Sequence, residues 1–243
     1  MVTQMTMDRL GGRQLKRRVR ELLTQGERGL AEILDFPLRR AVNPLFGFLY
    51  DRDALIRWRA VSAMGTVTAA LADCQPESAR VVMRRLLWNL NDESGGIGWG
   101  SPEAMGDILA RHEILAGEYA DLLVSYARED GNFIEYEALQ RWVVWALGRL
   151  AQVRPHLLTE VPALLVPYMS SSDAVIRGLS AWTAGLLKAG MLKERIQVLT
   201  IDRAKVIHYI DGCLIDRTVA ELADEALSRI LGRAETAQQT RAG

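Results

Sequence analysis

The chain has 243 residues, of which 49% are hydrophobic and 25% charged, so it can bury a large core. The 30 basic and 30 acidic residues cancel, which argues against a surface adapted mainly to nucleic acid or an anionic membrane. No stretch approaches the length of a membrane span, and the first residues lack an apolar signal core. Cys74 and Cys213 imply neither a disulfide framework nor a cysteine metal site. We therefore expect a cytoplasmic protein without a metal or cofactor.

Residues 9–20 carry six basic side chains and no acidic one, while Leu15, Val19 and Leu22 recur at helical spacing. This pattern is typical of an amphipathic helix with its apolar side turned inward and its charges in solvent. We favour a capping helix at the start of the fold over an arm that binds nucleic acid.

From residue 37 onward helix formers dominate, sustained strand alternation is missing, and one unit recurs about every 40 residues. Each unit is anchored on a small residue inside its second helix: Gly65, Gly106, Gly148, Gly185 and Ser228. Apolar residues nine and two positions before the anchor and two after it form one stripe at helical spacing. The position twelve before the anchor holds residues that cap helix N-termini: Asp53, Ser94, Asp173 and Asp216.

Segments 53–65 (DALIRWRAVSAMG) and 173–185 (DAVIRGLSAWTAG) show the unit best. This unit resembles the HEAT repeat and its bacterial phycobilisome-lyase-like variant. The resemblance implies an all-α fold, an α-solenoid of about five antiparallel helix pairs. The expected organisation is capping helices at 1–36, the repeat solenoid at 37–232 and a disordered tail at 233–243.

The second unit departs from this pattern in a glycine-rich stretch, NDESGGIGWG, at 91–100. The stretch replaces the first turns of the second helix, which restarts with Ser101 as its cap and Pro102 at its first position. Without a preceding strand or a G-K-[ST] sequence, we do not expect a classical phosphate loop. Either the loop exposes a helix start to an anion or a partner's carboxylate, or it is a surface irregularity. The candidate loop residues are Asn91, Asp92, Glu93, Ser94, Gly95 and Gly96.

Four tryptophans lie seven or three positions before the anchors, opposite the apolar stripe: Trp58, Trp99, Trp145 and Trp182. Because second helices line the concave side of HEAT-like solenoids, the resemblance implies an aromatic groove there, with Glu103, Glu137 and Arg141 between the rings. Grouped exposed aromatics mark binding sites. The alternative is that a neighbouring helix buries the tryptophans as a second core.

The function that we favour is a non-enzymatic scaffold that binds a protein or peptide segment in the tryptophan groove, with the glycine loop adding specificity. An alternative comes from alkylpurine DNA glycosylases built of HEAT-like repeats, whose W-D-L-V-D signature is similar to WNLND here. That resemblance makes Trp88 the contact to the damaged nucleotide and Asp92 the catalytic carboxylate, but Asn89 and Asn91 depart from the signature. Glutamates on the expected inner face also oppose DNA binding. A bilin-lyase-like subunit is a third alternative, which only the repeats support.

Overall fold

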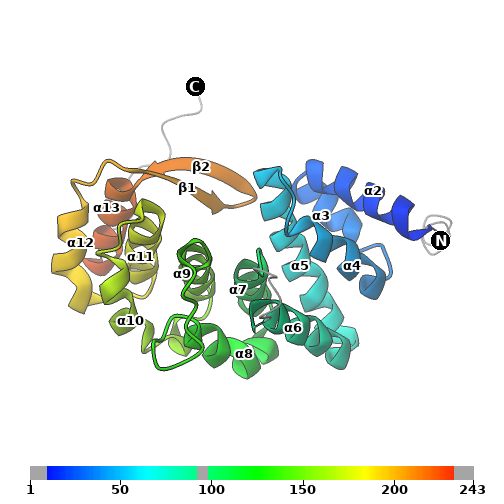
Figure 1. Cartoon of the computed structure of the whole chain (residues 1–243), viewed down its shortest axis with the longest axis horizontal. Coiled ribbons are helices and arrows are strands. Elements are labelled where there is room, and N and C mark those ends of the chain that lie inside the picture. Colours follow the sequence, from blue (N-terminus) through cyan, green and yellow to red (C-terminus); the bar gives the residue numbers. More distant parts are fainter. Residues whose placement is uncertain (1–9, 92–97, 233–243) are drawn as a thin grey trace. The chain divides into compact units, whose positions relative to one another are not determined.

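The computed structural model describes residues 10–91 and 98–232 (Figure 1). The contacts between residues divide the chain into two compact units. Unit 1 runs to Leu123 and includes Tyr209–Leu214, and unit 2 holds Val124–His208 and the residues from Ile215 onward. The predicted tail at 233–243 lies outside the described residues.

Helices dominate both units, and the fold is all-α with the helical repeats of an α-solenoid, as the sequence predicts. The helices that begin before the unit boundary are α2 (Gly12–Thr24), α3 (Glu27–Ile33), α4 (Leu38–Phe48), α5 (Ala54–Cys74), α6 (Pro76–Asn91), α7 (Ser101–Arg111) and α8 (Glu113–Ser125), the last of which crosses the boundary. The later helices are α9 (Glu137–Ala151), α10 (Val161–Tyr168), α11 (Ala174–Leu186), α12 (Lys193–Leu199) and α13 (Val219–Ile230), with short 3-10 turns at Pro155–Leu157 and Gly190–Leu192.

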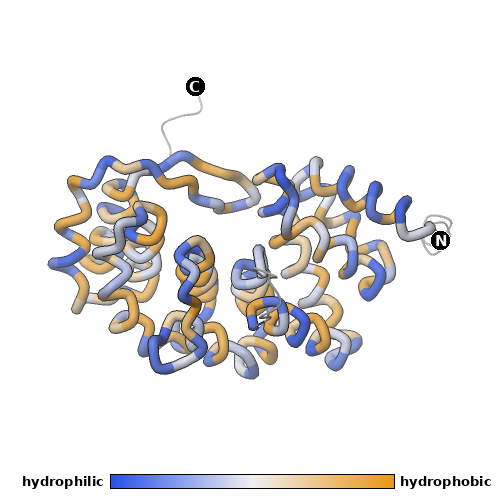
Figure 2. The backbone as a smooth tube through the Cα atoms, in the orientation of Figure 1, coloured by the Kyte–Doolittle hydropathy of each residue, from blue (hydrophilic) through white to orange (hydrophobic). Residues whose placement is uncertain are grey.

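Amphipathic patterning explains the N-terminal helix. In α2 the side chains of Leu15, Val19 and Leu22 are buried, whereas Lys16 and Arg17 are exposed. Hydrophilic and hydrophobic segments alternate along this and other helices (Figure 2). The inward stripe and the solvated charges of α2 are therefore as predicted.

Two of the predicted helix caps are confirmed. The Asp53 carboxylate accepts hydrogen bonds from the backbone N–H groups of Leu55 and Ile56, at 2.9 and 3.2 Å, at the start of α5. Asp173 caps α11 through the N–H groups of the equivalent residues. Each carboxylate satisfies two of the donors that a helix N-terminus leaves open.

Three of the anchor residues, Gly65, Gly148 and Gly185, lie where second helices approach one another. A Cβ atom on Gly148 would lie 2.0 Å from Cζ3 of Trp182, and one on Gly185 would lie 2.5 Å from Cα of Ala226. These contacts join α9 to α11 and α11 to α13 in unit 2. In unit 1, a Cβ on Gly65 would lie 2.0 Å from a carboxylate oxygen of Asp107, in α7. Close packing therefore requires glycine at Gly148 and Gly185, as the repeat pattern predicts, whereas at Gly65 the nearest atoms belong to the Asp107 side chain.

One element differs from the sequence prediction. Residues Lys205–Ile210 and Cys213–Thr218 form strands β1 and β2 of a two-stranded sheet. The turn residues Asp211 and Gly212 have φ of +48° and +77°, the left-handed conformation that a tight two-residue hairpin needs. The prediction of Asp216 as a helix cap is therefore wrong, because this residue lies in β2. Thr218 caps α13 instead, accepting a hydrogen bond from the N–H of Glu221 at 3.2 Å.

Candidate functional site

The predicted tryptophan groove is not open to solvent at three of its four rings. Trp58, Trp145 and Trp182 are 3%, 3% and 2% exposed, while Trp99 is half-buried. The expectation of an exposed aromatic surface at the first three positions is wrong, and the alternative of a second core is correct for them.

Close packing accounts for this burial within each unit. In unit 2 the ring of Trp182 occupies the space that the absent side chain of Gly148 leaves on the neighbouring helix. In unit 1 the ring of Trp58 stacks on Tyr209, with centroids 4.8 Å apart and planes 15° apart. The tryptophan faces are thus used in internal packing, which lowers the free energy of the folded state rather than that of a complex.

The charged residues expected between the tryptophans have separate surroundings. Glu103 is 2% exposed, and burial raises its pKa to about 7, against the opposing effects of its backbone hydrogen bond and of Arg57. Glu137 is exposed and accepts a hydrogen bond from Ser172 at 3.3 Å. Arg141 pairs with the α11 cap, Asp173. Arg141 therefore stabilises a helix start, and Glu103 lies inside the protein rather than on a groove.

The glycine-rich stretch is described only in part. Among the candidate loop residues, Asn91 ends α6, and the others lie outside the described residues: Asp92, Glu93, Ser94, Gly95 and Gly96. The helix restarts as predicted, but Ser101 is its first residue rather than its cap. Gly100 precedes it with φ of +76°, and a Cβ there would lie 2.7 Å from Cβ of Leu49. Residues 101–110 are all buried, so the start of α7 does not face solvent as an anion site would.

The most exposed tryptophan in the described residues is Trp88, on α6. Its side chain is 72% exposed, and Val81 on the same helix is 53% exposed. Val81, Arg85 and Trp88 lie four and three positions apart, so they share one side of α6. An exposed tryptophan beside an arginine is the composition of a binding hot spot. Trp88 was singled out in the sequence only through the glycosylase resemblance, whose catalytic residue Asp92 lies outside the described residues.

A pocket of about 240 Å³ adjoins this side of α6. Its lining comes from α4, α5 and α6: Arg39, Val42, Asn43, Phe46, Leu71, Ser78, Val81, Val82 and Arg85. Most of these side chains are apolar, two are cationic, and none of the residues described as lining the pocket is acidic. The pocket therefore suits an apolar group accompanied by a negative charge.

Arg85 is held in a fixed position at this pocket. Its guanidinium lies 3.9 Å from the centroid of the Phe46 ring, and its Nη1 donates a hydrogen bond to Oδ1 of Asn43 at 2.7 Å. The adjacent Arg84 instead pairs with Glu77 at 2.6 Å, and Arg80 pairs with Glu118 at 2.6 Å. A stacked arginine with a neutral partner keeps its positive charge available to a ligand.

We call the surface formed by Arg39, Asn43, Val81, Arg85 and Trp88 the α4–α6 surface. No group of three or more His, Cys, Asp or Glu side chains that could hold a metal occurs within residues 10–91 and 98–232. Across the same residues, no helix is both long enough and apolar enough to cross a membrane.

Comparison with known proteins supports the fold. No family model matches the sequence. A protein of Archaeoglobus fulgidus described as "Uncharacterized protein" is 29% identical over 115 residues, which is 46% of this chain and 54% of that protein. The match therefore spans about half the length of this relative.

Two solved structures with similar folds are designed armadillo repeat proteins. The protein YIII(Dq)4CqI has a TM-score of 0.53 and 15% identity, and the match covers 90% of this chain and 92% of that protein. The protein YIII(Dq.V1)4CPAF was solved in complex with the peptide (KR)4. It has a TM-score of 0.54 and 14% identity, and the match covers 88% of this chain and 91% of that protein. At these identities the likeness concerns the fold alone, and it supports a helical-repeat architecture. The HEAT family itself stays a prediction.

Proposed function

We propose that the chain is a non-enzymatic helical-repeat scaffold that binds a segment of a protein partner on the α4–α6 surface. The observation that carries this proposal is the exposed Trp88 on the same side of α6 as Arg85, beside a pocket with an apolar and cationic lining. Tryptophan and arginine contribute most of the binding free energy in many protein interfaces.

The arrangement favours an extended or helical protein segment over a small metabolite. The pocket holds about 240 Å³, which suits one large side chain, and Trp88 lies outside its lining. A ligand that contacts both must therefore present several groups along α6. One designed armadillo protein with a similar fold is bound to the basic peptide (KR)4, and the cationic lining here favours a partner of opposite charge.

A random peptide library displayed on phage and selected against the immobilised chain tests this proposal. We expect enriched peptides whose affinity falls about tenfold or more in Trp88→Ala or Arg85→Gln, because both changes remove interface contacts. Arg84→Gln is the matched control on the same helix, since Glu77 already neutralises Arg84, and it should change the affinity less than about twofold. Failure to enrich peptides, or equal losses in the three variants, would contradict the proposal.

A further inference from the structure

Three side chains on one side of α6 form a stripe on the α4–α6 surface: Val81, Arg85 and Trp88. They lie four and three positions apart, so the stripe is about 10.5 Å long at the helical rise of about 1.5 Å per residue. Val81 and Arg85 line the pocket beside α6, and Trp88 lies beyond it, closer to the end of the helix. A ligand that contacts the whole stripe therefore presents three groups in a row at this spacing.

The spacing of the stripe discriminates between backbone conformations of the bound segment. A β-strand rises about 3.3 Å per residue and alternates its side chains, so three residues on one face span about 13 Å, longer than the stripe. A polyproline II segment repeats one face every third residue, about 9 Å apart, and leaves no side chain opposite Arg85. An α-helix lying along α6 presents its residues i, i+3 or i+4, and i+7 on one face at the spacing of the stripe. An α-helix therefore matches all three groups.

The charges at the middle of the stripe favour an acidic helix. Arg85 has the neutral amide of Asn43 as its hydrogen-bond partner, and Arg39 on α4 adds a second cation to the same pocket. Within the described residues, no carboxylate pairs with Arg39 or Arg85, whereas the other two arginines of α6 both pair with glutamates. A carboxylate on the partner helix, opposite Arg85, supplies the complementary charge.

The two ends of the stripe favour apolar side chains. At the Val81 end the pocket lining includes Phe46 and Leu71, which are both buried. The pocket volume of about 240 Å³ suits one large side chain of the partner. At the other end the exposed ring of Trp88 offers an apolar face. The partner helix is therefore amphipathic, with apolar groups at both ends of its contact face.

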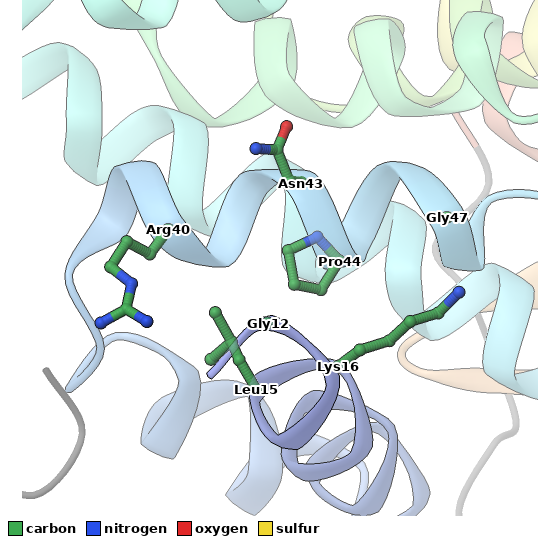
Figure 3. A pocket seen from close by; sticks show the side chains of 7 residues that line it. All are labelled: Gly12, Leu15, Lys16, Arg40, Asn43, Pro44 and Gly47. Carbon is green, nitrogen blue, oxygen red and sulfur yellow. The ribbon is translucent and has the colours of Figure 1, made fainter. Parts of the chain in front are cut away.

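A second pocket lies between α2 and α4, and Figure 3 shows Arg40 and Lys16 at its opposite ends. Arg40 donates a hydrogen bond to the carbonyl oxygen of Leu10 and has a further partner, so the chain itself occupies that end. The stripe on α6 instead adjoins a pocket with two cations that have no acidic partner in the described residues. We therefore place the partner helix along α6 rather than across α4.

We propose that the partner segment is an acidic amphipathic helix that lies along α6. One large apolar side chain enters the pocket, a carboxylate pairs with Arg85, and a second apolar side chain packs against Trp88. On the partner these groups occupy positions i, i+3 or i+4, and i+7. This inference rests on the proposed scaffold function and names the chemistry and the conformation of its partner.

Isothermal titration calorimetry with synthetic peptides up to about 2 mM tests the inference. The probe, AQAAQLAAEEAALQAAQA, consists of helix formers and carries two leucines on one face with two glutamates between them. Three comparison peptides each change one feature. The peptide AQALQAAAEEAAAQLAQA moves the leucines to the opposite face, AQAAQLAAQQAALQAAQA removes the charges, and AQAAQLAAEEPALQAAQA interrupts the helix with proline. We expect the probe to bind with a dissociation constant below about 0.2 mM, and each comparison peptide at least about fivefold more weakly.

Variants of the chain locate the contacts. Arg85→Gln should weaken the probe at least about fivefold and change the uncharged peptide less than about twofold, because only the probe pairs with this charge. Trp88→Ala should weaken both peptides, because both pack a leucine against the ring. Lys16→Gln removes an exposed cation away from α6 and is the control, which should leave the probe affinity within about twofold.

The outcomes separate this inference from the proposed function. If library peptides bind through Arg85 and Trp88 but the probe does not bind, or binds no more tightly than any one of the comparison peptides, the acidic helix is overturned and the scaffold function stands. Probe binding that is unchanged in Arg85→Gln and Trp88→Ala, or equally weakened in Lys16→Gln, places the peptide elsewhere and also overturns the inference. If neither library peptides nor the probe bind, the proposed function fails as well.

Discussion

The substitution Glu103→Gln should stabilise the protein at alkaline pH. Glu103 lies in the first turn of α7, is 2% exposed, and its Oε2 has no hydrogen-bond partner in the described part of the chain. Burial raises its pKa from 4.5 to about 7. Below pH 4.5 the carboxyl is protonated in both the folded and the unfolded chain and costs no stability through ionisation. As the pH rises from 4.5 to about 7, the unfolded chain loses this proton while the buried carboxyl keeps it, so stability falls; above about pH 7 the buried group ionises as well and the loss reaches its full size.

The size of the effect follows from the two pKa values. Each pKa unit corresponds to about 1.36 kcal/mol, so the change from 4.5 to about 7 in Glu103 corresponds to a loss of about 3 kcal/mol well above pH 7. Most of that loss, about 2 to 3 kcal/mol, falls between pH 5 and pH 9. Glutamine has nearly the shape of the protonated acid and does not ionise. The native protein should therefore lose that much stability relative to the variant over this range.

Urea unfolding of both proteins at pH 5 and pH 9 measures this difference, and other titrating groups cancel because both proteins contain them. Glu113→Gln is the matched control, since Glu113 lies in the first turn of α8 and is exposed. The difference in free energy of unfolding between the native protein and Glu103→Gln should grow from pH 5 to pH 9. A difference that stays constant with pH, or a change as small as that in the control, would refute the reasoning about this buried carboxyl.

Three further predictions concern packing, exposure and acid stability. Gly148→Ala should destabilise the protein by about 1 to 3 kcal/mol in urea unfolding, because the added Cβ overlaps the ring of Trp182. This loss of stability should be smaller in a Trp182→Leu background, and an unchanged stability would contradict the close approach of the two helices at Gly148. Trp88→Phe should remove the largest single share of the fluorescence that acrylamide quenches, because Trp88 is 72% exposed whereas three other tryptophans are buried and Trp99 and Trp142 are half-buried; unchanged quenching would show that Trp88 is covered. Burial beside two arginines lowers the pKa of His208 from 6.5 to about 4, so stability should fall as pH drops from 6.5 towards 4. His208→Gln should reduce that fall by about 3 kcal/mol in urea unfolding. An equal loss of stability at acid pH in the variant and the native protein would contradict the lowered pKa of His208.

Much of the fold could be predicted because the repeats are encoded locally. A recurring unit fixes which helix face is apolar, and residues such as Asp53 and Asp173 mark helix starts by their own chemistry. The hairpin was missed because the repeat register was extended over a segment of a different period. Asp211-Gly212 between VIHYI and CLI is a strong signal for a tight hairpin, and a search for period-two alternation would have found it.

The candidate site was less predictable because burial depends on neighbouring helices. The register correctly places Trp182 opposite the apolar stripe, but it does not show that Gly148 of another repeat receives the ring. The α4–α6 surface depends in the same way on a contact between Arg85 and Asn43, which are distant in sequence. Local spacing predicts the side of a helix on which a residue lies, whereas tertiary packing decides whether that side is covered.

The most direct measurement for the scaffold function is acrylamide quenching of tryptophan fluorescence with and without a library-selected peptide, in the native chain and in Trp88→Phe. If the partner segment covers the α4–α6 surface, saturating peptide should lower the quenching of the native chain by about half or more. The same peptide should leave the quenching of Trp88→Phe unchanged. Peptide binding that leaves native quenching unchanged would contradict the account, because the 72% exposed Trp88 would then lie outside the interface.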